Sequence, residues 1–318
     1  MRGFKAVLVV GALLWAPATA AAAEKPVVAT GAAGSVTPST AVLNGTVNPK
    51  GAATTYFFQI GTTSLYGTNT TATAAGAGTK RLRVSVPWTG FAPDTTYHYR
   101  LVAQNGKGIT RGAHKTFKTK RQPLGVSLLA TPNPVRIGGL TTLSGVLSGT
   151  DNGGRQISLK GNPWPYTQGF LPVGNTIVTN ADGSFSFTVP SISVNTQYVV
   201  QMPAKPAIIS PIVVVGTSAK VTRDLNVNRG SRSGTIRFTG RVTPAVDGRQ
   251  VIVQKLRRDN GVWMNIGKTF TRFSGGDSSR YRKTVRQKRG GRYRVLVVMD
   301  DKYSSSASRS VKVKRVRD

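Results

Sequence analysis

The sequence contains no cysteine and only two histidines among its 318 residues. The absence of cysteine excludes disulfides, thiolate metal sites, thiol catalysis and a lipid-anchored cysteine. Both histidines, His98 and His114, lie in the first part of the chain, which excludes a Ser-His-Asp site elsewhere and a metal site built from several histidines. Glu24 is the only glutamate, and aspartates such as Asp94 and Asp182 occupy turns, where this residue commonly bonds to nearby backbone. These absences predict a protein that is not an enzyme and needs no cofactor.

Metal and nucleotide motifs are also missing. Asp300 and Asp301 are adjacent carboxylates, but no alternating aspartate pattern of a calcium loop surrounds them. No glycine-rich loop of the form GxxxxGK[ST] occurs that would bind phosphate groups. We therefore predict no metal site and no nucleotide site.

The N-terminus has the pattern of a secretory signal peptide. Arg2 and Lys5 precede an apolar run over residues 6–15, and small residues fill 18–23. This run is shorter than the roughly 18 apolar residues that a membrane-spanning helix requires, and no later stretch reaches that length. We expect removal of residues 1–23, a secreted, extracellular product with or without cell-envelope association, and no integral membrane segment.

Short runs rich in Val, Thr, Tyr and Ile recur along the rest of the chain, separated by Gly, Pro, Asn and Asp. Examples are TAVLNGTV (40–47), SFSFTV (184–189) and RQVIVQK (249–255). Such runs, without helical periodicity, predict an all-β protein made of β-sandwiches. Within residues 97–103, alternation places Tyr97 and Tyr99 on a core face and a solvated His98 on the outer face.

The segment before Tyr97, GFAPDTT (90–96), predicts a tight corner whose tyrosine hydroxyl returns to the backbone. The longer stretch GFAPDTTYHYRLVAQNGKGITRGAHKTFKT (90–119) resembles the last strands of a fibronectin type III domain. VTPSTAVLNGTVNPKG (36–51) and TTYFFQIGTTSLYGT (54–68) resemble the first and middle strands of bacterial members. The resemblance implies a fibronectin type III-like domain over residues 24–120, with Trp88 and Phe91 as core residues.

The remaining chain contains an internal duplication. GGRQISLKG (153–161) parallels DGRQVIVQK (247–255), ADGSFSFTV (181–189) parallels GDSSRYRKTV (276–285), and TQYVVQM (196–202) parallels GRYRVLV (291–297). One strand order used twice is thus expected. Both copies resemble immunoglobulin-like repeats of secreted bacterial proteins, which implies two immunoglobulin-like β-sandwiches, residues 123–217 and 218–318. The alignment also predicts Phe170 and Trp263 as equivalent core residues.

Positive charge is concentrated at the end of the chain. The net charge is +33, and residues 218–318 carry 26 basic and 7 acidic groups, against 4 and 2 in residues 123–217. Many of these cations surround an expected hairpin turn at Gly290–Gly291. The candidate polyanion-binding residues are Arg237, Arg241, Arg280, Arg282, Lys283, Arg286, Lys288, Arg289, Arg292, Arg294, Lys312 and Lys314.

Such a surface predicts salt-dependent binding to anionic envelope or extracellular polymers. The alternative is a charged face that keeps the protein soluble and protects sheet edges. Dedicated nucleic-acid recognition is not expected, because the basic domain has no exposed aromatic series for base stacking.

A second candidate site is the loop GNPWPYTQGF (161–170), where Trp164 and Tyr166 stand between prolines. Two rings in a rigid loop can stack on a sugar or a protein partner, or they can fold back and cap the sandwich. The sequence therefore predicts a secreted, non-enzymatic structural or adhesive protein that binds anionic polymers through its last domain. The alternatives are a carbohydrate-binding protein that uses Trp164 and Tyr166, and an accessory component that acts with another protein.

Overall fold

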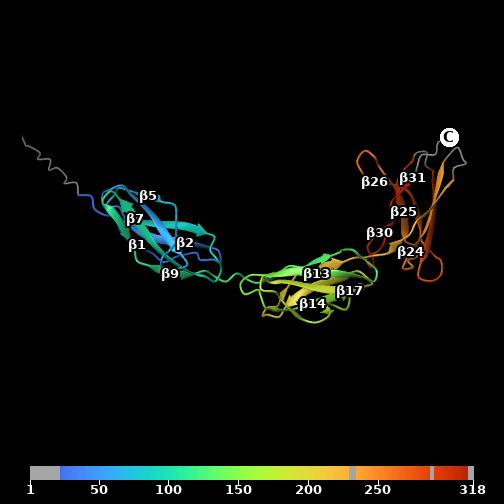
Figure 1. The fold of residues 1–318 in the computed structure, drawn as a ribbon, viewed down its shortest axis with the longest axis horizontal. Helices are drawn as coiled ribbons and strands as arrows, with labels where there is room; N and C mark the ends of the chain where they lie inside the picture. The colour runs from blue at the N-terminus through green and yellow to red at the C-terminus, as the bar shows by residue number, and fades with distance from the viewer. Residues whose placement is uncertain (1–21, 229–233, 287–289, 314–318) are drawn as a thin grey trace, which may run out of the picture. The chain divides into compact units, whose positions relative to one another are not determined.

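The computed structural model describes residues 22–228, 234–286 and 290–313, and within these ranges the chain forms strands and no helices (Figure 1). The predicted all-β class is therefore confirmed. No helix with the length and apolarity needed to cross a bilayer occurs in these ranges. Nearly all of the predicted signal peptide lies outside the described residues, and so do the candidate cations Lys288, Arg289 and Lys314.

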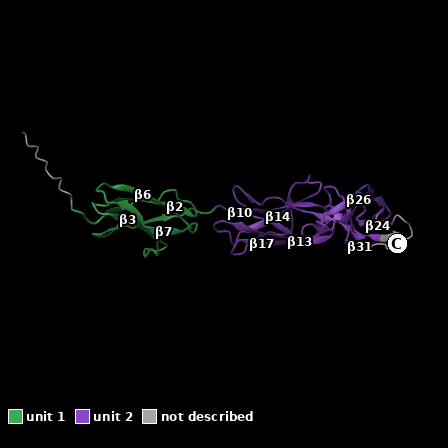
Figure 2. Cartoon of the chain, turned by 90° about the horizontal axis from the view of Figure 1, so that it is seen from above, with its two compact units in different colours: residues 1–122 green, residues 123–318 purple. Residues whose placement is uncertain are grey.

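The chain divides into two compact units, residues 1–122 and 123–318 (Figure 2). The first unit is a sandwich of two antiparallel sheets around a core that includes Leu43, Phe58 and Tyr99. One sheet has the order β1 (Val27–Thr30), β2 (Thr40–Asn48), β6 (Leu82–Thr89). The other has the order β4 (Thr68–Asn69), β3 (Thr54–Gly61), β7 (Thr96–Asn105), β8 (Gly108–Arg111), with β5 (Thr73–Gly76) on β3 and β9 (Lys115–Lys118) on β7.

The predicted tyrosine corner is present at the start of β7. The Tyr97 hydroxyl accepts a hydrogen bond from the backbone N–H of Ala92 at 2.9 Å, and the ring of Phe91 packs 4.5 Å from that of Tyr97. Tyr99 is fully buried and donates its hydroxyl hydrogen to the Gly31 carbonyl at 2.7 Å. The corner thus fixes the point at which β7 begins. The burial of Tyr99 agrees with the predicted alternation of residues along this strand.

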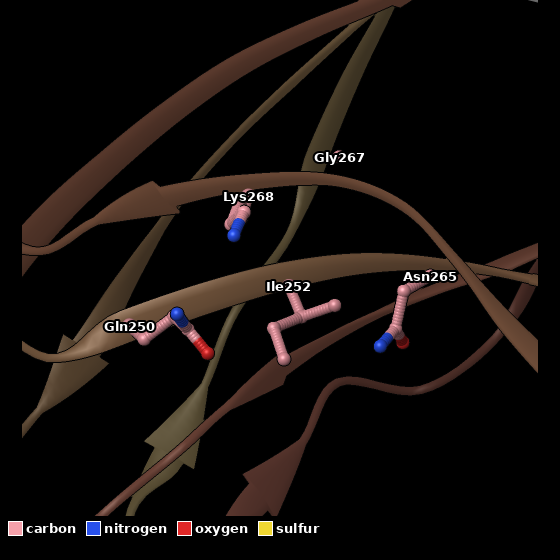
Figure 3. Close-up of a pocket in the computed structure, with 5 residues that line it drawn as sticks. All are labelled: Gln250, Ile252, Asn265, Gly267 and Lys268. Atoms are coloured by element: carbon pink, nitrogen blue, oxygen red, sulfur yellow. The ribbon is translucent and has the colours of Figure 1, made fainter.

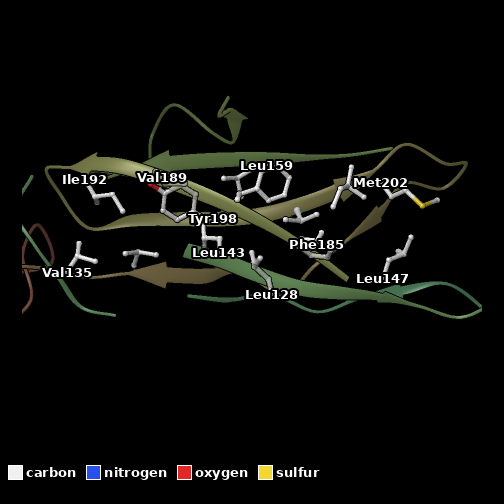
Figure 4. Close-up of a cluster of buried hydrophobic side chains, with 14 residues drawn as sticks. Leu128, Val135, Leu143, Leu147, Leu159, Phe185, Val189, Ile192, Tyr198 and Met202 are labelled. Atoms are coloured by element: carbon white, nitrogen blue, oxygen red, sulfur yellow. The ribbon is translucent and has the colours of Figure 1, made fainter. Parts of the chain in front are cut away.

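The second unit contains two sandwiches, each with its own hydrophobic core. The first of them has a buried core that includes Leu143, Leu159 and Phe185 (Figure 4). One sheet has the order β10 (Gly125–Val126), β13 (Gly139–Ser148), β11 (Leu129–Thr131), with β17 (Ser184–Ile192) also on β13. The other has the order β15 (Leu171–Pro172), β14 (Gln156–Pro163), β18 (Thr196–Met202), β19 (Ile208–Ile209), with β16 (Ile177–Val178) on β14 and β20 (Val213–Val215) on β18.

The last sandwich repeats this plan around a core that includes Phe238, Val253 and Tyr293. One sheet has the order β22 (Lys220–Val221), β24 (Thr235–Thr243), β28 (Ser279–Arg286), β27 (Arg272–Phe273), with β23 (Asp224–Asn228) also on β24. The other has the order β26 (Trp263–Phe270), β25 (Gln250–Leu256), β29 (Gly291–Val297), β30 (Ser306–Ala307), with β31 (Val311–Val313) on β29. A short parallel pair joins β12 (Val135–Arg136), within the first of these sandwiches, to β21 (Thr217–Ser218), in the segment that connects the two.

The duplication extends to individual hydrogen bonds. At equivalent places in the two sandwiches, a buried Ser or Thr hydroxyl accepts a hydrogen bond from a backbone N–H. In one sandwich Thr179 accepts from the N–H of Arg155, and Ser210 accepts from the N–H of Val200. In the other sandwich Thr271 accepts from Arg249 and Ser308 accepts from Val295. Bonds of the same kind in the first unit include those from Phe58 to Thr70 and from Thr95 to Thr119. We call these six contacts the hydroxyl clasps; they satisfy backbone donors that would otherwise be buried without a partner.

Candidate anion-binding surface

Three arginines lie side by side across the first sheet of the last sandwich. Arg241 on β24 stands directly opposite Arg280 on β28, and Arg280 stands opposite Arg272 on β27. All three side chains are exposed. Directly opposed residues on neighbouring strands have Cβ atoms about 5 Å apart, so like charges in this position repel. We call this set the arginine row.

More cations extend the same surface along the strands. Because alternate residues share a sheet face, Arg237 lies on the same face as Arg241 on β24, and Arg282 and Arg286 lie on the same face as Arg280 on β28. We call these three residues and the row together the arginine face. A hollow of about 650 Å³ crosses it, lined by the row and Arg282, together with Asp224, Thr239, Gly240, Thr269, Phe270 and Tyr281.

The positive charge of this face exceeds the negative charge beside it, because Asp224 is the one carboxylate among the residues that line the hollow. None of its six guanidinium groups forms an ion pair or a hydrogen bond with another side chain there. Three other acids of the same sandwich are engaged elsewhere: Asp300 pairs with Arg249, Asp259 pairs with Arg257 at 2.8 Å, and Asp247 accepts the Ser279 hydroxyl at 2.6 Å. The face therefore carries a net positive charge that its own side chains do not neutralise.

The predicted hairpin at Gly290–Gly291 is wrong, because β28 and β29 belong to opposite sheets of the sandwich. The candidate cations of residues 280–294 are consequently not one patch. Lys283 lies opposite the buried Phe238 and is half-buried. Arg294 covers Trp263, with its guanidinium carbon 4.3 Å from the ring centroid, and donates to the Gln254 side chain at 2.7 Å. Partial burial lowers the pKa of Arg294.

The remaining candidates form a second cationic hollow on the other sheet. Arg292 on β29 is directly opposite Lys312 on β31, and both are exposed. They line a hollow of about 1110 Å³ with Lys255, Arg257 and Arg258. Because Arg257 is already paired with Asp259, part of the positive charge of this second hollow is neutralised.

The aromatic loop lies against the neighbouring sandwich of the same unit. Trp164 is 37% exposed, and the Lys302 ammonium lies 5.5 Å from its ring centroid. The pKa of Tyr166 is raised, first by burial and then by the negative charge of Asp301. Lys302 and Asp301 come from a turn of the last sandwich, so the loop contacts that turn and leaves part of the Trp164 ring in solvent.

One residue beside this loop ties the two sandwiches together. The Asn195 side chain donates to the Asp301 carbonyl at 2.8 Å and accepts the Thr217 N–H at 2.7 Å. The backbone N–H of Asn195 donates to the Lys302 carbonyl at 2.9 Å, and the backbone carbonyl of Asn195 accepts the backbone N–H of Trp164 at 2.9 Å. Asn195 is 9% exposed, so these bonds are largely protected from water.

One further hollow and the acidic positions of the last sandwich offer little chemistry. The hollow in Figure 3, of about 300 Å³, is lined by Gln250, Ile252, Asn265, Gly267 and Lys268, which include no carboxylate, hydroxyl or imidazole. Asp300 is taken up by Arg249 and by the backbone of Lys302, and no group of three or more His, Asp or Glu residues placed to hold a metal occurs among the residues that the structure describes.

No family model and no curated protein matches this chain. Solved structures that match it include the sensor domain of the anti-sigma factor RsgI4 in Pseudobacteroides cellulosolvens, at 21% identity over 30% of this chain and 89% of that chain, with a TM-score of 0.21. The FN1–FN3 domains of chicken CNTN1 match at 13% identity over 92% of this chain and 99% of theirs, with a TM-score of 0.28. A tetra-tandem repeat from the extending region of a large adhesion protein matches at 16% identity over 91% of this chain and 74% of that chain, with a TM-score of 0.28.

Proposed function

We propose that this is an extracellular, non-enzymatic protein of structural or adhesive type that holds anionic polymers on its arginine face. The observation that carries the proposal is the arginine row, Arg241, Arg280 and Arg272, in direct register across three strands. Like charges at opposed positions destabilise a sheet, and an anion that lies across the row removes that repulsion. The planar arginine fork also pairs bidentately with phosphate and carboxylate groups.

The spacing of the face suits a polymer better than a small anion. Neighbouring strands lie about 4.8 Å apart, and alternate residues along a strand lie about 6.8 Å apart. Arg280, Arg282 and Arg286 follow this second spacing along β28, with Thr284 in the gap. A chain with closely spaced phosphates or carboxylates can therefore contact several guanidinium groups at once, and its binding should weaken steeply with salt.

The test uses residues 24–318 with long-chain polyphosphate, polyglutamate and neutral dextran as probes. The variant R241Q/R272Q/R280Q removes the row, and K80Q/R81Q/R83Q removes the same charge from exposed positions of the first unit. At about 50 mM salt the row variant should lose tenfold or more in affinity for an anionic probe. The slope of the logarithm of its binding constant against the logarithm of salt concentration should be smaller in magnitude by about 2. The control variant should lose much less.

Equal losses in both triple variants would show that net charge alone drives binding and would overturn the surface assignment. Failure of the unmodified chain to bind either anionic probe at low salt would overturn the function itself. A loss confined to R292Q/K312Q would instead assign the binding to the second cationic hollow.

One observation keeps the carbohydrate alternative as a second proposal: Trp164 is 37% exposed. Sugar stacking on this ring and on Tyr166 should persist at about 500 mM salt, where exposed charges are screened. It should disappear with Trp164→Ala and be unaffected by the row variant. If the chain instead acts as an accessory to another protein, neither Trp164→Ala nor the row variant should change probe binding, and an effect should appear only when that protein is added.

A further inference from the structure

The only two histidines of the chain meet on the surface of the first unit. His98, on β7, places its Nδ1 atom 3.1 Å from the Nε2 atom of His114, which immediately precedes β9. The two ring centroids are 5.1 Å apart, and His114 is exposed. Sixteen residues separate the two in the sequence, and the pairing of β7 with β9 brings them together.

A third side chain fixes the orientation of this pair. The other ring nitrogen of His114, Nδ1, lies 2.9 Å from the Tyr66 hydroxyl, and the two rings are in contact at 5.8 Å between centroids. Tyr66 is in turn covered by Arg100, whose guanidinium carbon is 4.6 Å from its ring centroid. Metal-binding histidines characteristically have the second ring nitrogen held in this way by a hydrogen-bond partner.

We propose that His98 and His114 form a two-imidazole site for a divalent transition ion, copper(II) most tightly. Metal–nitrogen bonds of about 2.05 Å put two adjacent ligand nitrogens about 2.9 to 3.4 Å apart for angles between square and tetrahedral. The observed separation of 3.1 Å falls within this interval. The ion takes the place of the proton shared by the two nitrogens, and this proton moves to a ring nitrogen that faces away from the ion.

The surroundings favour an ion that prefers nitrogen ligands. Magnesium and calcium require oxygen ligands, whereas neutral imidazole suits copper, nickel and zinc, with copper(II) the strongest of the series. The nearby cation Arg100 is held away over the Tyr66 ring and donates to the Gln59 side chain at 2.8 Å. Two protein donors leave the remaining ligand positions open to water or to a ligand from another molecule.

The experiment uses untagged residues 24–318, in which every imidazole signal comes from this pair. Copper(II) is titrated at about pH 7.5, and electron paramagnetic resonance is used to count the coordinated nitrogens. We expect one ion per chain with two imidazole nitrogens, and retention on immobilised nickel. H98Q and H114Q should each lose the two-nitrogen spectrum and the retention, while Y66F, which keeps both imidazoles, should keep the two-nitrogen spectrum at lower affinity.

An unchanged spectrum in H98Q or H114Q, or a single coordinated nitrogen in the unmodified chain, would overturn the site. So would equal copper affinity in the double variant H98Q/H114Q. Thermal unfolding of each variant without metal checks that the fold is intact. Because both histidines lie outside the arginine face, the outcome is independent of the polymer proposal.

Discussion

Asp94 illustrates how single side chains set the local geometry of the first unit. It adopts a left-handed conformation with φ of 52°, which aspartate tolerates better than most residues, within the corner that precedes β7. Its carboxylate lies 2.7 Å from the Lys118 ammonium of β9. The hydrogen bond and the charge of Lys118 lower the pKa of the Asp94 carboxyl below its ordinary value.

This lowered pKa predicts an acid-sensitive contribution to stability. A carboxyl with a lowered folded-state pKa stabilises the fold above the unfolded-state value of 3.8, and the contribution is lost as the pH falls below it. Asp94→Asn should therefore weaken the first unit at neutral pH and flatten its stability profile below about pH 4. Urea unfolding followed by Trp88 fluorescence, with Trp164 and Trp263 replaced by Phe, measures this. Asp182→Asn, in the second unit, is the control and should leave the Trp88 profile unchanged.

Trp263 shows where prediction from the sequence fails for a single residue. The internal alignment predicts it as a core residue, but it is only half-buried and its ring is covered by Arg294 on the outside of the sheet. The pairing of β25 with β26 shifts register between Val253 and Gln254. A shift of one residue exchanges the two faces of a strand, and a comparison of sequence segments alone does not reveal it.

At the scale of strands, most of the fold follows from local patterns. The tyrosine corner, the alternation in β7 and the repeated strand order are all visible in the sequence, because each depends on neighbouring residues. The arginine face is not visible, since Arg272 stands alone in its segment and joins Arg241 and Arg280 only through long-range pairing. For the same reason, the cation-rich run 279–294 divides between two sheets.

The arginine row predicts that binding and stability oppose one another. Arg280→Thr removes the central charge and should raise the free energy of unfolding of the last sandwich by about 0.2–1 kcal/mol at low salt, while it weakens polymer binding. The gain should vanish at high salt, where exposed charges are screened. Arg286→Thr is a matched control, because Arg286 lies on the same strand and face but opposite Thr235. Urea unfolding followed by Trp263 fluorescence, with Trp88 and Trp164 replaced by Phe, measures the free energy of unfolding of each variant at low and at high salt. Equal gains in the two variants would contradict the prediction.

At the scale of the whole molecule, each sandwich contains one tryptophan: Trp88, Trp164 or Trp263. The first unit has its own core, whereas the two sandwiches of the second unit share the hydrogen bonds of Asn195. Cooperative unfolding within the second unit is therefore expected to depend on that residue.

Asn195→Ala tests this coupling. The change leaves the buried Thr217 N–H without its partner, at a cost of about 1–3 kcal/mol, and removes the bond to the Asp301 carbonyl. In urea, the Trp164 and Trp263 transitions should coincide in the unmodified chain and separate in the variant. Asn180→Ala removes a side-chain bond to Ser184 inside one sandwich and should keep the transitions together. Coincident transitions in both variants would contradict the coupling.

The hydroxyl clasps have a consequence for the conditions in which this protein can exist. Each clasp is a hydrogen bond from a backbone N–H to a Ser or Thr hydroxyl, and the six clasps are distributed two to a sandwich. A hydroxyl is not oxidised to a disulfide, and the chain has no thiol. The folded state therefore has no dependence on thiol–disulfide potential, and the same structure should form in the reducing interior of a cell and in an oxidising medium.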